Sequence, residues 1–364
     1  MCVVTFDFEE NDAIEKVKNF KKKKTLSWVV LEITDACNIN CLWCYANAGY
    51  AIKRPRKHMP FENLKKVLKL LLDAGVKQIT FSGGEPTIYP RIKDAIKIAK
   101  DMGFVVHINT NGYVLTKDLI REFKYLGLSQ IQTNIDSINP VKHDFIRGMP
   151  GSFEKAVRCL KNASEVGITA VSQTVLTNLN EKEVIDIFRL ARDLGVHRCR
   201  VWDMTPSEGM AKMNINLAPT DYLKTLENLY EYGIENGLKR IETGDPLFPL
   251  ERKLSVEVTG GFCVSYHGAS TTISPHGDVF YCATYRKPLY NVFQDEIEVT
   301  LDKFHKERLS EFIKREIDLP PPCKKCAFSE TCAGSCIVRR SANPFSIDTF
   351  CRFIQVEKTI PRNL

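Results

Sequence analysis

The sequence predicts an α/β protein, a partial (β/α)6 TIM-like barrel followed by a small C-terminal domain rich in cysteine. Apolar, strand-like runs alternate with segments of helical periodicity, and such alternation indicates parallel strands joined by right-handed helical crossovers. From residue 260 onward, cysteine, glycine and proline become frequent, and this change in composition indicates the second domain.

Six strand–helix units can be recognised. The strand-like runs are Trp28–Ile33, Gln78–Ser82, Phe104–Asn109, Gln130–Ile135, Thr169–Val175 and Arg198–Asp203. The helix-like segments are Phe61–Ala74, Ile92–Met102, Lys117–Tyr125, Phe153–Val166, Glu181–Leu194 and Asp221–Asn236. The first helix is the clearest, since Pro60 precedes it and Gly75 follows it. Its predicted buried face is Leu64, Val67, Leu68, Leu71 and Leu72. The rest of the chain supplies no seventh and eighth unit, so the barrel is expected to be open.

The predicted boundaries follow from these units. We expect an N-terminal lead-in over residues 1–27, the barrel over 28–236, a connector over 237–259 and the cysteine-rich domain with its tail over 260–364. Pro246 and Pro249 favour an irregular connector.

Composition excludes several classes of function. The net charge of +7 is spread along the chain, and its basic residues are not interleaved with aromatics, so a nucleic-acid module is not expected. The one basic run, Lys21–Lys24, is either a solvated lead-in or a docking point for an acidic electron donor of the flavodoxin or ferredoxin kind. Neither a signal-peptide pattern nor an apolar stretch of ~20 residues is visible, which predicts a cytoplasmic protein without a membrane span. In that reducing compartment, 13 cysteines favour metal binding or catalysis over disulfides.

Three of these cysteines, Cys37, Cys41 and Cys44, have the spacing C-x3-C-x2-C directly after the first predicted strand. Parallel α/β folds carry their chemistry at the carboxyl ends of the strands. Three thiolates can hold three irons of a cubane cluster and leave the fourth iron free for a substrate or cofactor. The alternatives are buried thiols or part of a zinc site, which normally takes four ligands.

This triplet resembles the signature of the radical S-adenosylmethionine (SAM) enzymes, in which the open iron binds SAM. The run Gly83-Gly84-Glu85-Pro86 after the second strand resembles the family's GGEP motif, which implies contact with the amino group of SAM. Further SAM contacts implied by the resemblance are the backbone of Tyr45 at the adenine, Asn134 at the ribose and Gln173 at the carboxylate.

Two more segments resemble family motifs without a settled role. Thr110-Asn111-Gly112 resembles a TNG turn, and His143-Asp144-Phe145-Ile146-Arg147-Gly148 resembles an HDxxRG segment. Each is interpreted either as part of the SAM or substrate site or as a structural turn.

The C-terminal cysteines resemble the seven-cysteine pattern of the SPASM extension, which holds two auxiliary [4Fe–4S] clusters. The resemblance implies an inner cluster on Cys263, Cys282 and Cys336. Its fourth iron is either open or bound by the substrate or by a non-cysteine group, for which His267 and Tyr266 are nearby candidates with packing as their alternative role. The implied ligands of the outer cluster are Cys323, Cys326, Cys332 and Cys351. A zinc ribbon on Cys323, Cys326, Cys332 and Cys336 is the alternative. Cys159 and Cys199 are predicted to be core thiols, and Cys2 has no assigned role.

The resemblance as a whole implies a radical SAM oxidoreductase with three [4Fe–4S] clusters that modifies a peptide or peptide-like substrate. With only about 27 residues before the first strand, no separate leader-binding domain is expected. Ala283, where sulfatase-maturing relatives carry an acidic base, counts against that activity. The alternatives are a tetrapyrrole decarboxylase and a multi-cluster electron carrier. Tyr285, Arg286 and Lys287 are expected in a surface loop, with contact to substrate carboxylates as the alternative.

Overall fold

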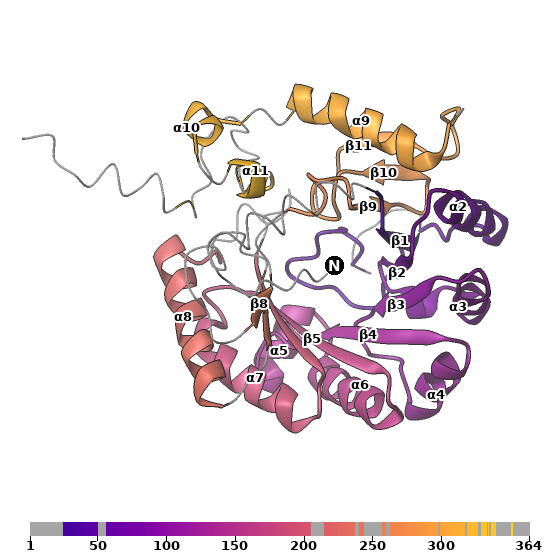
Figure 1. Cartoon of the computed structure of the whole chain (residues 1–364). Helices are drawn as coiled ribbons and strands as arrows, with labels where there is room; N and C mark the ends of the chain where they lie inside the picture. Colours follow the sequence, from indigo (N-terminus) through magenta and orange to yellow (C-terminus); the bar gives the residue numbers. More distant parts are fainter. Residues whose placement is uncertain are drawn as a thin grey trace, which may run out of the picture.

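The computed structural model describes residues 25–49, 56–204, 215–236, 240–243, 257–259, 263–297, 299–316, 319–326, 329–332, 334, 336–339 and 351. Its strands form one curved sheet of eleven strands, and the helices lie along the outer side of the curve (Figure 1). The predicted α/β class and partial barrel are confirmed. Within the described part of the chain, no helix is long and apolar enough to cross a membrane.

The six predicted strands are all present, and each pairs in parallel with the next along the chain. Their observed ends lie within two residues of the predicted ones. The strands are β1 (Trp28–Thr34), β2 (Gln78–Gly83), β3 (Val105–Asn109), β4 (Leu128–Asn134), β5 (Thr169–Leu176) and β6 (Arg198–Asp203).

The helices of the barrel also agree closely with the sequence pattern. They are α2 (Phe61–Asp73), α3 (Ile92–Asp101), α4 (Lys117–Tyr125), α5 (Pro140–Arg147), α6 (Ser152–Val166), α7 (Val184–Asp193) and α8 (Pro219–Glu235), with short 3₁₀ turns η1 (Pro86–Ile88) and η2 (Glu181–Glu183). The predicted helix from Glu181 therefore begins as the separate turn η2. In α2, four of the five expected core residues are buried, but Leu72 is 41% exposed and the prediction for it is wrong. Leu72 lies beyond the edge of the apolar stripe that faces the sheet.

The two faces of the sheet differ in polarity. Leu31, Phe81 and Ile131 face the helices and are fully buried in the main hydrophobic core. Residues one position further along the strands, such as Glu32 and Gln132, lie on the opposite, concave face. Parallel strands covered by apolar layers on both sides are normally apolar throughout. The polar alternation therefore marks the concave face as a surface for chemistry rather than for core packing.

The sheet continues beyond the six predicted units. Strands β7 (Arg240–Thr243) and β8 (Glu257–Thr259) extend it in parallel past β6, within the stretch predicted as a connector. These strands have four and three residues, too short to produce a recognisable apolar run. Within the described residues, no pairing between β8 and the opposite edge closes the barrel.

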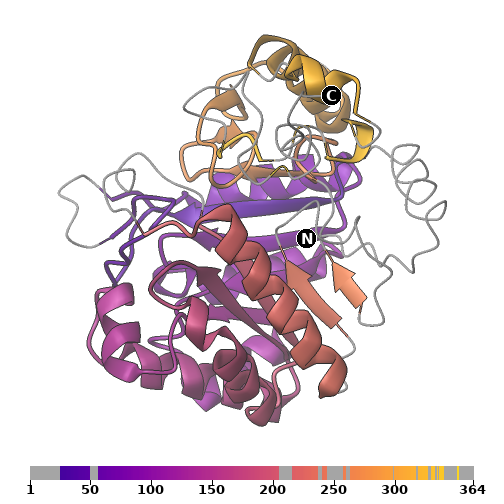
Figure 2. The same cartoon turned by 90° about the vertical axis from the view of Figure 1, so that its left-hand side faces the viewer.

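The C-terminal segment joins the same sheet at its other edge. Strand β9 (Ser270–Ile273) pairs in parallel with β1, and β10 (Asp278–Phe280) and β11 (Pro288–Asn291) follow as antiparallel strands. Helices α9 (Leu301–Glu316), α10 (Pro321–Lys324) and α11 (Ser329–Cys332) complete this segment. Figure 2 shows the orange and yellow C-terminal elements gathered at one end of the barrel. The boundary predicted at residue 260 therefore does not separate two sheets.

Candidate functional site

The cysteine loop follows β1 at the carboxyl end of the sheet. Its three thiols, those of Cys37, Cys41 and Cys44, are free and partly exposed. Burial, with repulsion from neighbouring anions that include the other two thiolates, raises the pKa of Cys37 to about 12. Burial likewise raises the pKa of Cys41 to about 11. The three sulfurs thus share one electrostatic environment, and a positively charged metal group there would favour their thiolate forms.

Single-ion metal sites need donors that converge on one point. Within the described ranges, no group of three His, Cys, Asp or Glu side chains does so. A cubane differs from a single ion, because it spreads its thiolates over separate irons. The donor set of this loop consists of soft thiolates, the ligands that iron–sulfur clusters use.

The glycine pair after β2 packs directly on this loop. Gly84 N–H donates to the carbonyl of Thr34 (2.8 Å), and Glu85 N–H donates to the carbonyl of Ala36 (2.7 Å). A Cβ atom on Gly83 would lie 2.1 Å from the Thr34 oxygen, and one on Gly84 would lie 2.0 Å from the Ala36 oxygen. Gly83 also has a φ of +119°. Only glycine fits either position, so the sequence motif is explained by close contact with the cysteine loop.

The Glu85 carboxylate is buried and holds the neighbouring turns together. It accepts hydrogen bonds from Thr87 N–H (3.0 Å), Thr110 Oγ1 (2.7 Å) and Asn111 N–H (2.7 Å), as well as from the Thr87 hydroxyl. Burial raises the pKa of Glu85, and these hydrogen bonds act against that effect. Pro86 is buried and begins η1. The contact of Glu85 with the amino group of SAM stays a prediction.

The TNG turn belongs to the same cluster of interactions. Asn111 Nδ2 donates to Asn38 Oδ1 at 2.7 Å, which ties the turn after β3 to the cysteine loop. Gly112 has a φ of +73°, and a Cβ there would lie 2.9 Å from the Cβ of Cys159. The described contacts therefore support the structural interpretation of this turn.

Tyr45 lies between the cysteine loop and the concave face of the sheet. Its hydroxyl is 3.4 Å from Ser82 Oγ. Burial, with the nearby charge of Glu32, raises the pKa of Tyr45 to about 12, so the phenol stays neutral. The ring is thus engaged with β2, and the backbone contact of Tyr45 with adenine stays a prediction.

Asn134 and Gln173 lie side by side, since they are register partners on β4 and β5. Gln173 Oε1 accepts a hydrogen bond from Gln132 Nε2 at 2.9 Å. Gln132 also accepts from Arg200 of β6, whose guanidinium is paired with Glu242 of β7. These residues form a continuous polar row across four strands of the concave face. The structure brings both predicted SAM contacts to this row without testing their roles.

The HDxxRG segment supplies the carboxyl half of helix α5 and its C-cap Gly148, and the sequence pattern did not predict this helix. His143 Nε2 is 3.3 Å from the carbonyl oxygen of Asn134, and its Nδ1 is 3.3 Å from Ser152 Oγ. Asp144 accepts hydrogen bonds from Gly151 N–H (2.6 Å) and Phe153 N–H (2.8 Å) and so anchors the start of α6. These polar residues therefore fix α5 between β4 and α6.

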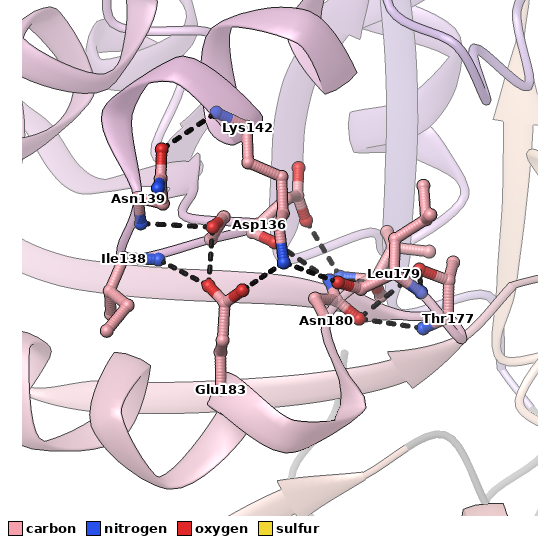
Figure 3. A network of polar contacts seen from close by, with 10 residues as sticks. Asp136, Ile138, Asn139, Lys142, Thr177, Leu179, Asn180 and Glu183 are labelled. Carbon is pink, nitrogen blue, oxygen red and sulfur yellow. Dashed lines mark hydrogen bonds and ion pairs between the residues drawn. The ribbon is translucent and has the colours of Figure 1, made fainter.

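A polar network holds the loops after β4 and β5 together (Figure 3). Asn180 Nδ2 donates to the carbonyl of Asp136 (2.9 Å), and Asn180 Oδ1 accepts from Thr177 N–H (2.8 Å). Glu183 accepts from Ile138 N–H (3.0 Å) and forms an ion pair with Lys142. The carboxyl ends of two strands are thereby held in a fixed relation beside the cysteine loop.

A second group of cysteines gathers around Tyr281, directly after β10. The Tyr281 hydroxyl is 3.5 Å from Cys263 Sγ. Burial raises the pKa of Tyr281 well above its usual value, and the thiolates of Cys263, Cys282 and Cys336 raise it further. These three are the cysteines predicted to share the inner auxiliary cluster, and the structure brings them together within one hydrophobic cluster.

A family model described as the radical SAM superfamily matches residues 31–191, which run from β1 to α7 and include the cysteine loop and the glycine pair. Residues 31–191 form a radical SAM domain. The chain is accordingly an enzyme, and members of that superfamily use SAM and a [4Fe–4S] cluster.

Individual relatives of this radical SAM enzyme cover most of its length. It is 25% identical over 327 residues to the AdoMet-dependent heme synthase of Methanosarcina barkeri, covering 85% of this chain and 90% of that protein. It is 27% identical over 328 residues to the mycofactocin maturase MftC of Mycolicibacterium smegmatis, covering 89% and 80%. Streptococcus suis SuiB, solved with its precursor peptide SuiA, shares the fold with a TM-score of 0.73 at 17% identity, covering 94% and 80%.

The remaining C-terminal cysteines of the radical SAM enzyme differ in burial. Cys323 is buried in α10, Cys332 ends α11, and Cys326 N–H donates to the carbonyl of Cys323 at 3.2 Å. Cys326 and Cys351 are partly exposed. Their grouping into an outer cluster stays a prediction. Of the three cysteines without a ligand role, Cys159 is fully buried as expected, Cys199 is half-buried, and Cys2 lies outside the described residues.

Tyr266 and His267, the nearby candidates for a further ligand, contact each other edge to face with ring centroids 5.3 Å apart. His267 is buried. Both residues therefore have packing roles next to Cys263, and a ligand role for either stays a prediction.

Sequence reasoning missed two charged contacts that join the C-terminal segment to the barrel. Arg286 was expected in a surface loop, but its guanidinium donates to both carboxylate oxygens of Glu32 at 2.8 Å. Arg339 donates to Asp203 at the end of β6 (2.5 Å). The one available signal was the presence of a carboxylate, Glu32, inside an otherwise apolar strand.

Proposed function

We propose that this chain is a SPASM-type radical SAM oxidoreductase that modifies a peptide or peptide-like substrate. The observation that carries the proposal is the arrangement of two cysteine groups around the Glu32–Arg286 pair. Arg286 follows Cys282 by four residues, and Glu32 interacts electrostatically with Tyr45, the residue after Cys44. A substrate on the concave face between the two groups would be within reach of both.

The first group would hold the SAM-binding cluster on Cys37, Cys41 and Cys44. When bound, such a cluster supplies the electron that cleaves SAM and so generates a 5′-deoxyadenosyl radical, which abstracts hydrogen from the substrate. The backbone of Gly83, Gly84 and Glu85 would hold the amino group of SAM, with Pro86 closing the turn. Tyr45, Asn134 and Gln173 keep the roles that the family resemblance implies: adenine, ribose and carboxylate contacts.

The second group would hold an auxiliary cluster on Cys263, Cys282 and Cys336. Cys336 lies next to Tyr281 and Cys282. This position argues against a zinc ribbon, in which Cys336 would bind the zinc together with Cys323, Cys326 and Cys332. An outer cluster on Cys323, Cys326, Cys332 and Cys351 completes the proposed set of three. A flavodoxin- or ferredoxin-like protein would supply electrons.

The substrate class rests on relatives and on the polarity of the concave face. The maturase relative and the SuiB complex with its precursor peptide support a peptide substrate. The row of Gln132, Gln173 and Arg200 makes the concave face polar, which suits a substrate with a polar backbone. Both observations favour peptide maturation as the activity.

A tetrapyrrole decarboxylase is the second candidate, because the heme synthase relative is matched over 90% of its length. The two activities can be separated by mass spectrometry after anaerobic incubation with SAM and dithionite. Iron coproporphyrin would lose propionate carboxyl groups in the second case and stay intact in the first. A library of short peptides would acquire two-hydrogen losses or crosslinks in the first case and stay unmodified in the second.

A further inference from the structure

The carboxyl end of α5 is fastened to the cysteine loop at two points. Leu42 N–H donates to the carbonyl of Ile146 at 2.9 Å. Gly148 has a φ of +59°, and a Cβ on it would lie 2.1 Å from the carbonyl oxygen of Asn40. Arg147 stands between these two contacts in the sequence, so its backbone is held against residues 40–42. The position of Arg147 relative to Cys41 is therefore set by the backbone and not by a flexible loop.

The side chain of Arg147 is fixed as well. Its Nη1 donates to Asp136 Oδ2 at 3.2 Å, and the side chain is 12% exposed. Asp136 is fully buried, and its other oxygen accepts from Val175 N–H at 3.0 Å. The carboxylate is thus anchored to β5, and it directs the guanidinium. Such a buried pair keeps one geometry, because either charge left alone would lack compensation.

The guanidinium acts on the thiolates of the cysteine loop. Arg147 lies close enough to Cys41 and Cys37 for its positive charge to act on both thiol groups. Coulomb interactions in a partly buried site are several times stronger than in water. A permanent positive charge is therefore part of the electrostatic environment of the proposed cluster.

Reduction of a cluster by one electron adds one negative charge to it. A fixed cation nearby stabilises the reduced state more than the oxidised state, and nearby charge is one of the factors that set cluster potentials. We propose that Arg147 raises the reduction potential of the cluster on Cys37, Cys41 and Cys44, and that Asp136 is the positioning residue that holds Arg147 in place. This inference rests on the proposed binding of a cluster at those cysteines.

Anaerobic redox titration of the full chain tests the inference. Electron paramagnetic resonance (EPR) would follow the reduced signal that changes when SAM is added, which separates this cluster from any auxiliary ones. The test variant is Arg147→Gln, because it removes the positive charge alone and keeps a neutral donor to Asp136, whose negative charge also acts on Cys41. Arg147→Lys keeps the charge. Lys142→Met with Glu183→Gln is the matched control, since it removes an ion pair that joins the same helix to η2.

We expect Arg147→Gln to lower the ratio of reduced to oxidised cluster at a fixed potential about tenfold, which equals a shift of about 59 mV for one electron. Arg147→Lys and the control pair should change that ratio less than threefold. If Arg147→Gln does not load the cluster, Arg147→Met repeats the measurement with another uncharged side chain. If a neutral Arg147 variant binds the cluster and its ratio of reduced to oxidised cluster is unchanged, this inference is wrong but the proposed function still stands. A wild-type chain without any SAM-responsive cluster would overturn the proposed function too.

Discussion

Glu32 and Arg286 form a two-pronged ion pair between the first strand of the barrel and the loop after Cys282. Both bonds measure 2.8 Å, and the residues are 254 positions apart in the sequence. The Glu32 side chain is 2% exposed, and the Arg286 guanidinium also lies over the ring of Phe280, 4.4 Å from its centroid. Fork-to-fork geometry of this kind fixes orientation as well as distance. The pair therefore sets how the C-terminal cysteines stand relative to the cysteine loop.

Removal of the arginine alone should destabilise the chain. Arg286→Met leaves Glu32 buried without its counter-charge, and we expect a loss of about 2–4 kcal/mol in the free energy of unfolding. Chemical denaturation under anaerobic conditions would measure it. The combination of Arg286→Met with Glu32→Gln should recover more than half of that loss. If the double variant were as unstable as the single one, the stabilising role assigned to this ion pair would be wrong.

Substitution of the second motif glycine should impair the first cluster. Gly84→Ala places a Cβ 2.0 Å from the Ala36 carbonyl oxygen, so the cysteine loop must move. We expect the iron content to fall by about four atoms per chain, the content of one cubane. Gly75→Ala is the control, because it strains a left-handed glycine with nothing within 4 Å of the new Cβ. Equal iron contents in the two variants would show that the close contact does not matter for the cluster.

Removal of a cysteine from the second group should cause the loss of the inner auxiliary cluster but not of the SAM-binding cluster. Cys336→Ala should remove the inner auxiliary cluster, which lowers the iron content from about twelve to about eight atoms per chain. The SAM-dependent EPR change should persist, because the first cysteine loop is intact. Cys199→Ala, which alters a half-buried thiol on β6, should keep the full iron content. A normal iron content in Cys336→Ala would contradict the assignment of this residue as a ligand.

The chain should become less stable as the pH falls, because His305 is buried in its neutral form. This residue is 1% exposed, its Nδ1 is 3.1 Å from the Tyr290 hydroxyl, and burial lowers its pKa to about 4. The unfolded chain takes up the proton at about pH 6.5, so stability is complete above that pH and is lost between pH 6.5 and 4. The loss attributable to His305 amounts to about 2 kcal/mol at pH 5.

Urea unfolding at pH 7.5 and pH 5 would measure this effect in the wild type and in His305→Leu. The variant lacks the titrating group and should lose about 2 kcal/mol less between the two pH values. Its missing hydrogen bond to Tyr290 lowers stability equally at both pH values and cancels in the comparison. The same pH dependence in both proteins would mean that His305 is protonated normally in the folded chain.

The local pattern of the sequence was sufficient to predict most of the barrel. Apolar runs and helical periodicity placed six strands within two residues of their observed ends, because a strand or a helix face is encoded by neighbours in the chain. The short strands β7 and β8 escaped detection, since four and three residues carry no distinct period. Leu72 was misplaced because helical spacing locates an apolar stripe but not its edge.

The parts of the site that consist of short sequence motifs could be predicted. The ion pairs between residues far apart in the sequence could not. The cysteine spacing and Gly83–Pro86 are each contained in fewer than ten residues, and the structure brings them into contact. The Glu32–Arg286 and Asp203–Arg339 pairs join residues more than a hundred positions apart. Arg147 meets Cys41 through the same kind of long-range contact. One sequence contains no signal for such pairs beyond a charge in an apolar strand.

EPR spectroscopy of the anaerobically purified, dithionite-reduced chain, with and without SAM, tests the central assignment most directly. We predict that SAM alters the spectrum of one [4Fe–4S] cluster and that 5′-deoxyadenosine accumulates. Both effects should vanish when Cys37, Cys41 and Cys44 are all replaced by alanine, while about eight irons remain. Zinc in place of iron at these cysteines, or a reduced cluster whose spectrum does not respond to SAM, would contradict the account.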